Sequence, residues 1–530
     1  MKINKIKIHN IKSNTWKYRV LLLLLFSFVF SVNAQDTIKV QNHIIDDQIK
    51  DQIFRYPIIY TTPNIKDFTF TEVSYEHQQN EFARKQIANE INTYQFSAQG
   101  YFTTKSKWKF FGDLSIKKIL EKNLGWVLSD DRAEEHEVIA PHYFYVPRKA
   151  NWDNQAYVLS GGFSKDITNH LSVAVKANYG TEKYSRTLDA RSQIIKRNLG
   201  GELQIGYQIL QNHKAFILGS YAENQKDFDY TYNNLNLNYE AYPETYLRFN
   251  AGYGRILNYF KNTESGYLYQ DIVDKIGLGY TFTGKNSILT VLYYTQNSNN
   301  VFYTSSLDLP ENERMKIKTK SNHAELFAFH KWNNIEIQST LQFDQSDARN
   351  FDKQSNGYNY TNSLNKINWT TSFSKKTGSK IDYLFGLNVL YQQNEYHDIL
   401  ATAHIELNSL NTGIYTSKDF AFKKSKLNAT ASFNMYFPLS SSKLNYYDTS
   451  GGTNARFFDE VIIYDYAVNT TNYFAPAIRL EYSYPVKNNK TVVFFTNLKE
   501  KIALKKQTDY PVSINTNNTY WVQMGVQLNY

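Results

Sequence analysis

The last twelve residues of the chain read TYWVQMGVQLNY, from Thr519 to Tyr530. From Tyr520 onward every second residue is apolar: Tyr520, Val522, Met524, Val526, Leu528 and Tyr530. Two glutamines, Gln523 and Gln527, fall on the alternate positions. Successive side chains of a β-strand point to opposite faces, so this period of two predicts a strand with one apolar face and one polar face.

The same alternation recurs along the chain in segments of about ten residues, the length of a tilted strand that crosses a bilayer. The clearest segments are residues 94–102, 108–116, 171–179, 199–207, 335–343, 381–391 and 427–437. The pattern predicts strands with a lipid-facing apolar side and a lumen-facing polar side. The predicted lumen-facing residues include Asn388, Gln392, Gln523 and Gln527.

Aromatic residues are abundant, with 43 Tyr and 34 Phe against only 4 Met, and the mean hydropathy is −0.54. After residue 34 no apolar run approaches the roughly 18 residues of a helical membrane span. Barrel strands keep the mean hydropathy low because only alternate residues face lipid. Tyrosine also suits the interfacial girdles, since its ring is apolar and its hydroxyl is polar. The composition is therefore typical of an outer-membrane β-barrel.

Residues 1–34 have the features of a secretory signal peptide. A basic stretch precedes an apolar run from Val20 to Val32, and Val32–Asn33–Ala34 fits a small-residue cleavage site. Six of the 59 Lys and Arg residues lie in this segment, so 53 remain against 49 acidic residues. This mild excess does not indicate a nucleic-acid partner. The chain contains no cysteine, which excludes disulfides and lipid attachment at a cysteine.

Short and long connections alternate between the predicted strands, as in barrels with short periplasmic turns and long extracellular loops. Eight short connections lie at residues 105–107, 164–170, 211–214, 284–286, 331–334, 375–380, 423–426 and 486–490, and a ninth is predicted near 241–244. The long ones are 117–153, 298–317, 346–360, 438–458 and 501–518. Nine periplasmic turns predict an all-β, antiparallel transmembrane barrel of about 20 strands (range about 16–22) over residues 67–530. Residues 35–66 are left as a short periplasmic or lumen-entering segment.

The signal ending in Asn33–Ala34, the aromatic barrel and the terminal tyrosine resemble outer-membrane barrels of Bacteroidota-type bacteria. More specifically, Tyr184–Arg191 is similar to an Asp-Pro-Arg-Pro element of an uncharacterised barrel family often found beside TonB-dependent receptors. Here Ala190 and Ser192 stand in place of the prolines. TonB-dependent receptors carry a large plug domain before the barrel, whereas roughly 30 residues precede the first strand here. The likeness implies a receptor-like barrel of the outer membrane without a plug domain.

Three charged residues near a predicted strand end, Arg186, Asp189 and Arg191, form a candidate ligand-binding or rim cluster. The connection 117–153 carries an acidic run that begins at Asp130. This connection is interpreted as a solvated loop, a Ca²⁺-binding loop or an inward fold that narrows the lumen. The run matches no EF-hand pattern, and no nucleotide fingerprint or Cys/His metal spacing occurs. No metal or cofactor is therefore predicted.

Two classes of barrel enzyme are alternatives to a channel. A phospholipase needs a histidine and a serine on adjacent lipid-facing strand positions, and His323 and His330 lie on a predicted strand. A protease at the extracellular rim needs acidic and His-Asp pairs, for which Asp130–Asp131 and His397–Asp398 are the right residue types. No local motif singles out a nucleophile, so no catalytic residue is predicted.

The sequence therefore predicts an outer-membrane channel or transport-related barrel for small solutes. One alternative is a plugged barrel that binds or assembles with a lipoprotein or a TonB-dependent receptor, and another is an outer-membrane hydrolase. Outer-membrane lipids are expected around the barrel. The barrel assembly machinery is expected to recognise the terminal strand, with its apolar set from Tyr520 to Tyr530.

Overall fold

The computed structural model of this chain describes residues 52, 54–61, 67–132, 141–257, 266–378, 380–446, 456–486, 490–506 and 513–530. The predicted signal peptide, residues 1–34, lies outside the described residues, as does most of the predicted N-terminal segment 35–66. Among the residues that are described, no helix is both long and apolar enough to cross a membrane.

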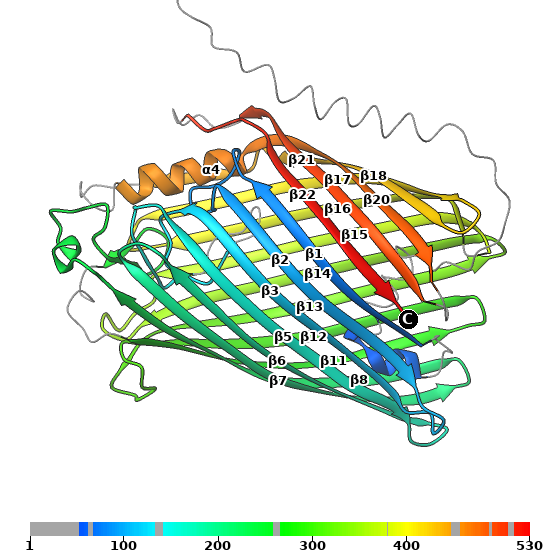
Figure 1. Ribbon diagram of the computed structural model, residues 1–530. Coiled ribbons are helices and arrows are strands. Elements are labelled where there is room, and N and C mark those ends of the chain that lie inside the picture. The colour runs from blue at the N-terminus through cyan, green and yellow to red at the C-terminus, as the bar shows by residue number, and fades with distance from the viewer. Residues whose placement is uncertain are drawn as a thin grey trace, which may run out of the picture.

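Eighteen antiparallel strands form one closed barrel (Figure 1), which confirms the predicted fold class. The strands are β1 (Phe68–Gln79), β2 (Glu90–Thr103), β3 (Lys109–Leu124), β5 (Ala150–Asp166), β6 (Leu171–Arg186), β7 (Arg191–Leu210), β8 (His213–Thr231), β11 (Tyr267–Thr283), β12 (Ser287–Tyr303), β13 (Glu313–Trp332), β14 (Ile335–Asp352), β15 (Tyr360–Thr377), β16 (Lys380–Asp398), β17 (Ala403–Ala421), β18 (Lys426–Pro438), β20 (Thr471–Pro485), β21 (Thr491–Lys506) and β22 (Thr519–Asn529). Each pairs with its sequence neighbour among these strands, so the barrel is an up-and-down meander.

The barrel closes where the last strand meets the first. β22 pairs antiparallel with β1, in a register that sets Val526 opposite Val73 and Met524 opposite Tyr75. The backbone N–H of Tyr530 donates to the carbonyl oxygen of Thr69 at 2.9 Å. The alternating terminal stretch is therefore a sealing strand, and no edge is left unpaired between β1 and β22.

Apolar side chains point outward from the barrel wall. The exposed ones include Val73, Phe96, Leu159, Tyr179, Leu199, Ile217, Ile276, Val291, Leu326, Leu341, Ile367, Phe385, Ile414, Phe433, Tyr482, Phe494 and Met524, which lie on strands around the whole circumference. Their neighbours of opposite parity point into the barrel and are largely polar. This arrangement is the apolar belt of a barrel whose outer face contacts lipid.

The two ends of the barrel differ in the length of their connections. All eight predicted short connections join consecutive barrel strands at one end, here called the turn end, near which the C-terminus lies (Figure 1). The predicted ninth, near 241–244, is wrong, because those residues lie within one long connection between β8 and β11 at the opposite, loop end. Eight turns give 18 strands, which falls inside the predicted range.

Several strands extend well beyond the segments that alternate in sequence. β12 reaches Tyr303 and β13 begins at Glu313, so the connection predicted at 298–317 shrinks to residues 304–312. Similarly, β14 continues to Asp352 through a stretch with polar residues on both faces. In these strand extensions the backbone pairing continues although neither face is apolar. Hydrophobic periodicity therefore identifies only the part of each strand that lies in the apolar belt.

Smaller elements lie in the connections. They are η1 (Pro57–Thr61), β4 (Tyr143–Tyr145), η2 (Leu235–Asn238), β9 (Arg248–Asn250), β10 (Ile256–Leu257), β19 (Lys443–Tyr446), η3 (Phe458–Ile462) and α4 (Ile463–Asn469). β19 pairs with β17 beyond the end of β18, so β18 and β19 together act as one interrupted strand.

A segment before the first strand packs against inward-facing residues of the wall near the turn end. Lys176 Nζ on β6 donates to the carbonyl oxygen of Phe54 at 3.2 Å, and the backbone N–H of Ile58 donates to Gln204 Oε1 on β7 at 3.2 Å. Ile58 and Ile59 are buried against wall residues such as Phe111 and Phe216. Residues 54–61 therefore lie in the lumen and cover part of its wall.

Candidate functional site: a loop plug across the lumen

Three long connections fold inward at the loop end and contact one another. They are residues 125–132 with 141–149, residues 232–257, and residues 456–470, together called the loop plug. In the plug, β9 pairs with both β4 and β10 in a small three-stranded sheet. The backbone N–H of Leu128 donates to Phe144, and that of Arg148 donates to Glu244. The inward loops thus satisfy many of their backbone groups within the plug, as burial requires.

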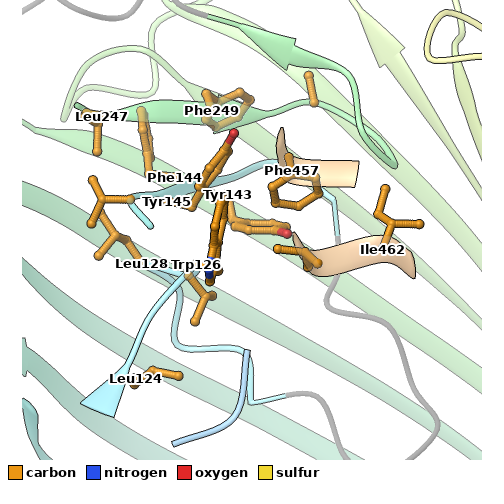
Figure 2. Close-up of a cluster of buried hydrophobic side chains, with 14 of the residues drawn as sticks. Leu124, Trp126, Leu128, Tyr143, Phe144, Tyr145, Leu247, Phe249, Phe457 and Ile462 are labelled. Carbon is orange, nitrogen blue, oxygen red and sulfur yellow. The ribbon is translucent and has the colours of Figure 1, made fainter. Parts of the chain in front are cut away.

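Aromatic side chains of the plug gather in one buried cluster (Figure 2). Some of them also contact aromatic rings of the barrel wall. Phe144 on β4 stacks on Phe228 of β8 with ring centroids 4.8 Å apart. It also contacts Tyr267 of β11 at 4.7 Å and Phe249 of the plug at 4.8 Å. Phe249 stacks in turn on Phe302 of β12 at 5.0 Å. Each of these rings is at most 2% exposed, so one continuous aromatic core joins plug and wall.

The third connection covers the other side of this core. Phe457 contacts Tyr145 with ring centroids 4.9 Å apart and meets Trp126 edge-on at 6.0 Å. Farther along, Tyr436 Oη on the inner face of β18 donates to the carbonyl oxygen of Asn469 in α4 at 2.8 Å. The helix is therefore held between the wall and the other two loops.

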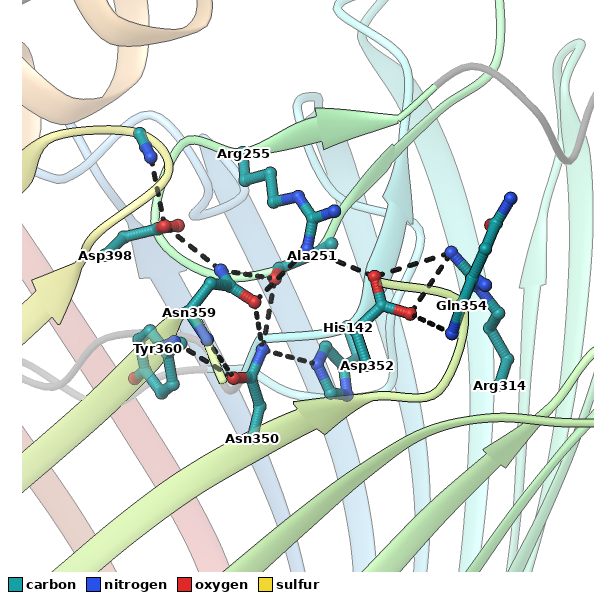
Figure 3. A network of polar contacts seen from close by, with 11 residues as sticks. His142, Ala251, Arg255, Arg314, Asn350, Asp352, Gln354, Asn359, Tyr360 and Asp398 are labelled. Atoms are coloured by element: carbon teal, nitrogen blue, oxygen red, sulfur yellow. Dashed lines mark hydrogen bonds and ion pairs between the residues drawn. The ribbon is translucent and has the colours of Figure 1, made fainter. Parts of the chain in front are cut away.

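A buried polar network binds the 251–255 turn of the plug to three adjacent strand ends (Figure 3). Asn359 Nδ2 donates to Asp398 Oδ1 at 3.0 Å and to the carbonyl oxygen of Ala251 at 3.2 Å. The backbone N–H of Tyr253 donates to Asp398 Oδ2 at 2.6 Å. Asn350 Nδ2 donates to Asn359 Oδ1 at 2.7 Å. Asn350, Asn359 and Asp398 are each at most 2% exposed, so these bonds form out of contact with water.

Asp352 extends the network as a buried ion-pair centre. Its carboxylate lies 3.2 Å from a guanidinium nitrogen of Arg255 in the plug and 3.2 Å from one of Arg314 on β13. The residue is 0% exposed. Removing one partner of such a pair is strongly destabilising, because it leaves a buried charge without compensation. Arg255 therefore anchors the turn electrostatically where Asp398 anchors it by hydrogen bonds.

Two residues of the predicted acidic loop are anchored in the wall. Asp130 Oδ1 accepts from Lys226 Nζ at 2.8 Å, and Lys196 Nζ lies 3.5 Å from Asp130 Oδ2. Burial opposes ionisation of Asp130, but the two lysines outweigh it and hold the pKa of its carboxyl well below the usual value. Arg132 makes a two-pronged ion pair with Glu121 at 2.8 and 3.0 Å. The Ca²⁺ interpretation of this loop is therefore not supported at Asp130, and Glu134, Glu135 and Glu137 lie outside the described residues.

His142 sits at the centre of the network in its neutral form. Burial lowers the pKa of its imidazole to about 3. Its Nε2 lies 3.4 Å from Asn350 Nδ2, and its carbonyl oxygen accepts from Tyr269 Oη at 3.0 Å. A neutral imidazole accepts a hydrogen bond without placing a second cation beside Arg255.

Asp465 of α4 links the plug to the β1–β2 connection and is expected to make stability depend on pH. It accepts from the backbone N–H of Lys85 at 2.8 Å, and burial raises the pKa of its carboxyl to about 6. The folded protein then binds more protons than the unfolded chain between pH of about 4 and 6. Stability should therefore fall as the pH rises through this window, by up to roughly 3 kcal/mol from this group.

The measurement for this prediction is the thermal unfolding temperature at pH 5 and pH 7. Asp465→Asn keeps an oxygen to accept from Lys85 but cannot ionise, so the wild type should lose more stability between the two pH values than the variant. An equal loss in both proteins would contradict the assignment.

The lumen wall between the plug and residues 54–61 carries a ladder of amides. Asn178, Asn198 and Asn224 on β6, β7 and β8 are linked in series through their side-chain amides. Asn224 Nδ2 then donates to Asp271 Oδ2 at 3.1 Å, and Ser298 Oγ donates to Asp271 Oδ1 at 2.6 Å. These side chains point inward and are only partly buried, so the interior is a polar surface.

The predicted rim cluster is engaged in contacts within the protein. The guanidinium of Arg186 donates to the carbonyl oxygens of Leu188 and Ala190 at 2.7 Å each, and it is 4% exposed. Asp189 accepts from Arg191 Nε at 3.1 Å and from the backbone N–H of residue 233 at 3.2 Å. These contacts hold the β6–β7 turn against the plug. A ligand role for Arg186, Asp189 and Arg191 stays a prediction.

The predicted lumen-facing residues lie on β16 and β22. Asn388 and Gln392 share a face of β16 with buried Leu384, opposite exposed Phe385. On β22, Gln523 and Gln527 alternate with Tyr520, Met524 and Val526, which are exposed. Tyr530 is 50% exposed and its ring lies 4.7 Å from Lys490 Nζ.

The residues weighed for enzyme chemistry do not form a complete site. His397 and Asp398 point to opposite faces of β16, so they make no pair. His330 on β13 does meet Ser287 on β12, with Ser287 Oγ 2.7 Å from His330 Nδ1. Among the described residues, no carboxylate or amide side chain orients the second nitrogen of that imidazole, as a hydrolase triad requires.

One comparison with known proteins identifies a family. A family of unknown function, DUF6850, matches residues 57–530, and the chain belongs to this family. No curated protein matches the chain.

Several solved barrels match at low identity. The ferric preacinetobactin receptor BauA from Acinetobacter baumannii is 10% identical, with 88% of this chain and 80% of that chain covered and a TM-score of 0.39. The outer membrane transporter YddB from Escherichia coli is 7% identical, with 88% of this chain and 81% of that chain covered and a TM-score of 0.37. The FrpB iron transporter from Neisseria meningitidis is 8% identical, with 89% of this chain and 83% of that chain covered and a TM-score of 0.38.

Proposed function

We propose that this protein is an outer-membrane barrel for small polar solutes whose lumen is closed at rest by its own loops. The loop end faces outward in this proposal, because long loops are extracellular and short turns periplasmic in such barrels. Outer-membrane lipids then contact the apolar belt, and the assembly machinery recognises the terminal strand β22.

The observation that carries the proposal is the loop plug. An aromatic core around Phe144 and a polar network around Asp398 both join the loops to the wall, and this supports a lumen that the loops close at rest. A permanently open porin does not need this double attachment. Below the plug, the amide ladder of Asn178 to Asp271 offers hydrogen bonds to a polar solute. Passage therefore requires that the plug move.

The test compares three barrels in planar lipid bilayers. In the first variant a short Gly-Ser linker replaces residues 126–147, which removes strand β4 of the plug together with Phe144 at its aromatic core. In the second, an equal linker replaces residues 305–311, a connection outside the plug. We expect the wild type and the second variant to stay closed and the first variant to conduct. The proposal is wrong if the first variant assembles as a heat-modifiable barrel and still carries no current.

If the variant lacking residues 126–147 does not conduct, the loop plug instead favours a role in binding a partner protein. A closed barrel that presents ordered loops outward is suited to dock a lipoprotein or a TonB-dependent receptor. Co-purification from native membranes with a stoichiometric second protein is then the expected result.

A further inference from the structure

A cluster of two histidines and a glutamate lies on the outer face of the barrel at the loop end. Glu395 and His397 belong to β16, and His404 belongs to β17. Their side chains share the outward face of β16 with Phe385, which is 57% exposed. They lie beyond the apolar belt, since the outward positions of β16 change from apolar to polar after Tyr391.

The ligand atoms of the three residues converge. His397 and His404 are directly opposite each other in the strand register, and their rings stack with centroids 4.0 Å apart. His397 Nε2 lies 2.8 Å from Glu395 Oε1, and His404 Nε2 lies 3.2 Å from the same oxygen. Within the described part of the chain, this is the one group of three histidine or carboxylate residues whose ligand atoms all lie within 4.8 Å of one another.

The charges around the cluster favour a cation. Glu406 of β17 lies directly opposite Glu395, and like charges in that relation destabilise a strand pair. Lys443 of β19 is opposite Glu406 on its other side, and Asn408 Nδ2 donates to Glu406 Oε1 at 2.7 Å. Two carboxylates therefore face each other across one strand pair with two imidazoles beside them.

We propose that Glu395, His397 and His404 form a binding site for a divalent transition-metal ion such as Zn²⁺. Zinc binds imidazole nitrogen and carboxylate oxygen at about 2.0–2.2 Å, and tetrahedral geometry then separates its ligand atoms by roughly 3.3 Å. The separations of 2.8 and 3.2 Å need only a small outward shift to match this. A hard cation such as Ca²⁺ fits less well, because it prefers oxygen ligands.

The site leaves a fourth ligand position for water or Glu406, as three-ligand zinc sites do. Its side chains are 45%, 28% and 35% exposed for His397, His404 and Glu395, so an ion reaches them from solvent. The ion would also tie the ends of β16 and β17 together, next to Asp398, which holds the plug.

Zinc binding to the purified barrel tests the site. The protein is isolated in detergent with an affinity tag free of histidine, and Zn²⁺ alone is titrated by calorimetry. The absence of cysteine removes thiolate ligands as a background. We expect one bound ion per chain, and affinity lower by about tenfold or more in His397→Ala and in His404→Ala. The matched control is His170→Ala, an exposed histidine at the turn end, which should bind Zn²⁺ as the wild type does.

A second readout separates ligation from nonspecific effects. With Cu²⁺ as the probe, electron paramagnetic resonance of the wild type should show two coordinated imidazole nitrogens, and each histidine variant should show one fewer. Glu395→Gln keeps both imidazoles and should retain the two-nitrogen signature with weaker binding. A wild type that binds no Zn²⁺, or a His397→Ala, His404→Ala double variant that binds it equally well, would overturn the proposal.

Discussion

We expect a Phe144→Ala barrel to open far more often than the wild type in single-channel recordings. Phe144 is 1% exposed and contacts the wall rings of Phe228 and Tyr267. Truncating a buried phenylalanine costs about 3–5 kcal/mol, because transfer energy is lost and a cavity is left. The lost contacts exist only while the plug is docked on the wall. The cost therefore destabilises the docked state of the plug relative to the undocked state.

Each 1.4 kcal/mol changes an equilibrium about tenfold, so the undocked population should rise by about two to four orders of magnitude. The measurement is the open probability at constant voltage. Leu235→Ala is the control, since Leu235 lies in the same loop system but is 75% exposed on η2. Equal open probabilities for Phe144→Ala and Leu235→Ala would show that the aromatic core does not hold the plug.

Gly252→Ala is expected to displace the 251–255 turn from the wall. A methyl group at Gly252 would lie 2.3 Å from Asp398 Oδ2 and 2.6 Å from Asn359 Nδ2. Neither side chain can move away without breaking the buried hydrogen bonds that it makes to the plug. Overpacking of this kind costs about 1–3 kcal/mol, and the unpaired donors and acceptors add to it.

Trypsin reports this displacement because Arg255 lies in the turn and is bound to Asp352 in the wild type. Cleavage after Arg255 in the assembled barrel should be fast in Gly252→Ala and slow in the wild type. Gly357→Ala is the matched control, since a methyl group there meets its nearest neighbour, Ser355 O, at an ordinary 3.7 Å. If Gly252→Ala resists trypsin as Gly357→Ala does, the turn is not held by close packing.

The barrel itself was predictable because its signal is local. Alternation such as that of Ile381 to Tyr391 reflects the two media on either side of a strand, and it needs no knowledge of distant residues. The eight short turns were found for the same reason. The false turn near 241–244 shows the limit, because the apolar residues that follow it, such as Leu247 and Phe249, face the plug core and not lipid.

The contacts of the loop plug could not be predicted from alternation in the sequence. The sequence places Asp398 beside His397 as a candidate His-Asp pair, but adjacent strand residues point to opposite faces. Asp398 instead binds Tyr253, which is 145 positions away in the chain, and His397 meets His404. His397 lies beyond the predicted strand 381–391, and no strand is predicted around His404. The alternation pattern therefore does not pair the two histidines.

What the sequence by itself determined is the barrel, its apolar belt and the strand that seals it, because each follows from which medium a residue faces at its own position in a strand. Only the tertiary structure decided that three long connections fold inward and pack against the barrel wall. The plug depends on Phe144 meeting Phe228, and on Tyr253 meeting Asp398, contacts between segments that the curvature of the barrel brings together. Hydrophobic periodicity carries no information about such pairs. Whether a loop is buried or solvated depends on the distant residues that it meets in the folded chain, and not on its own composition.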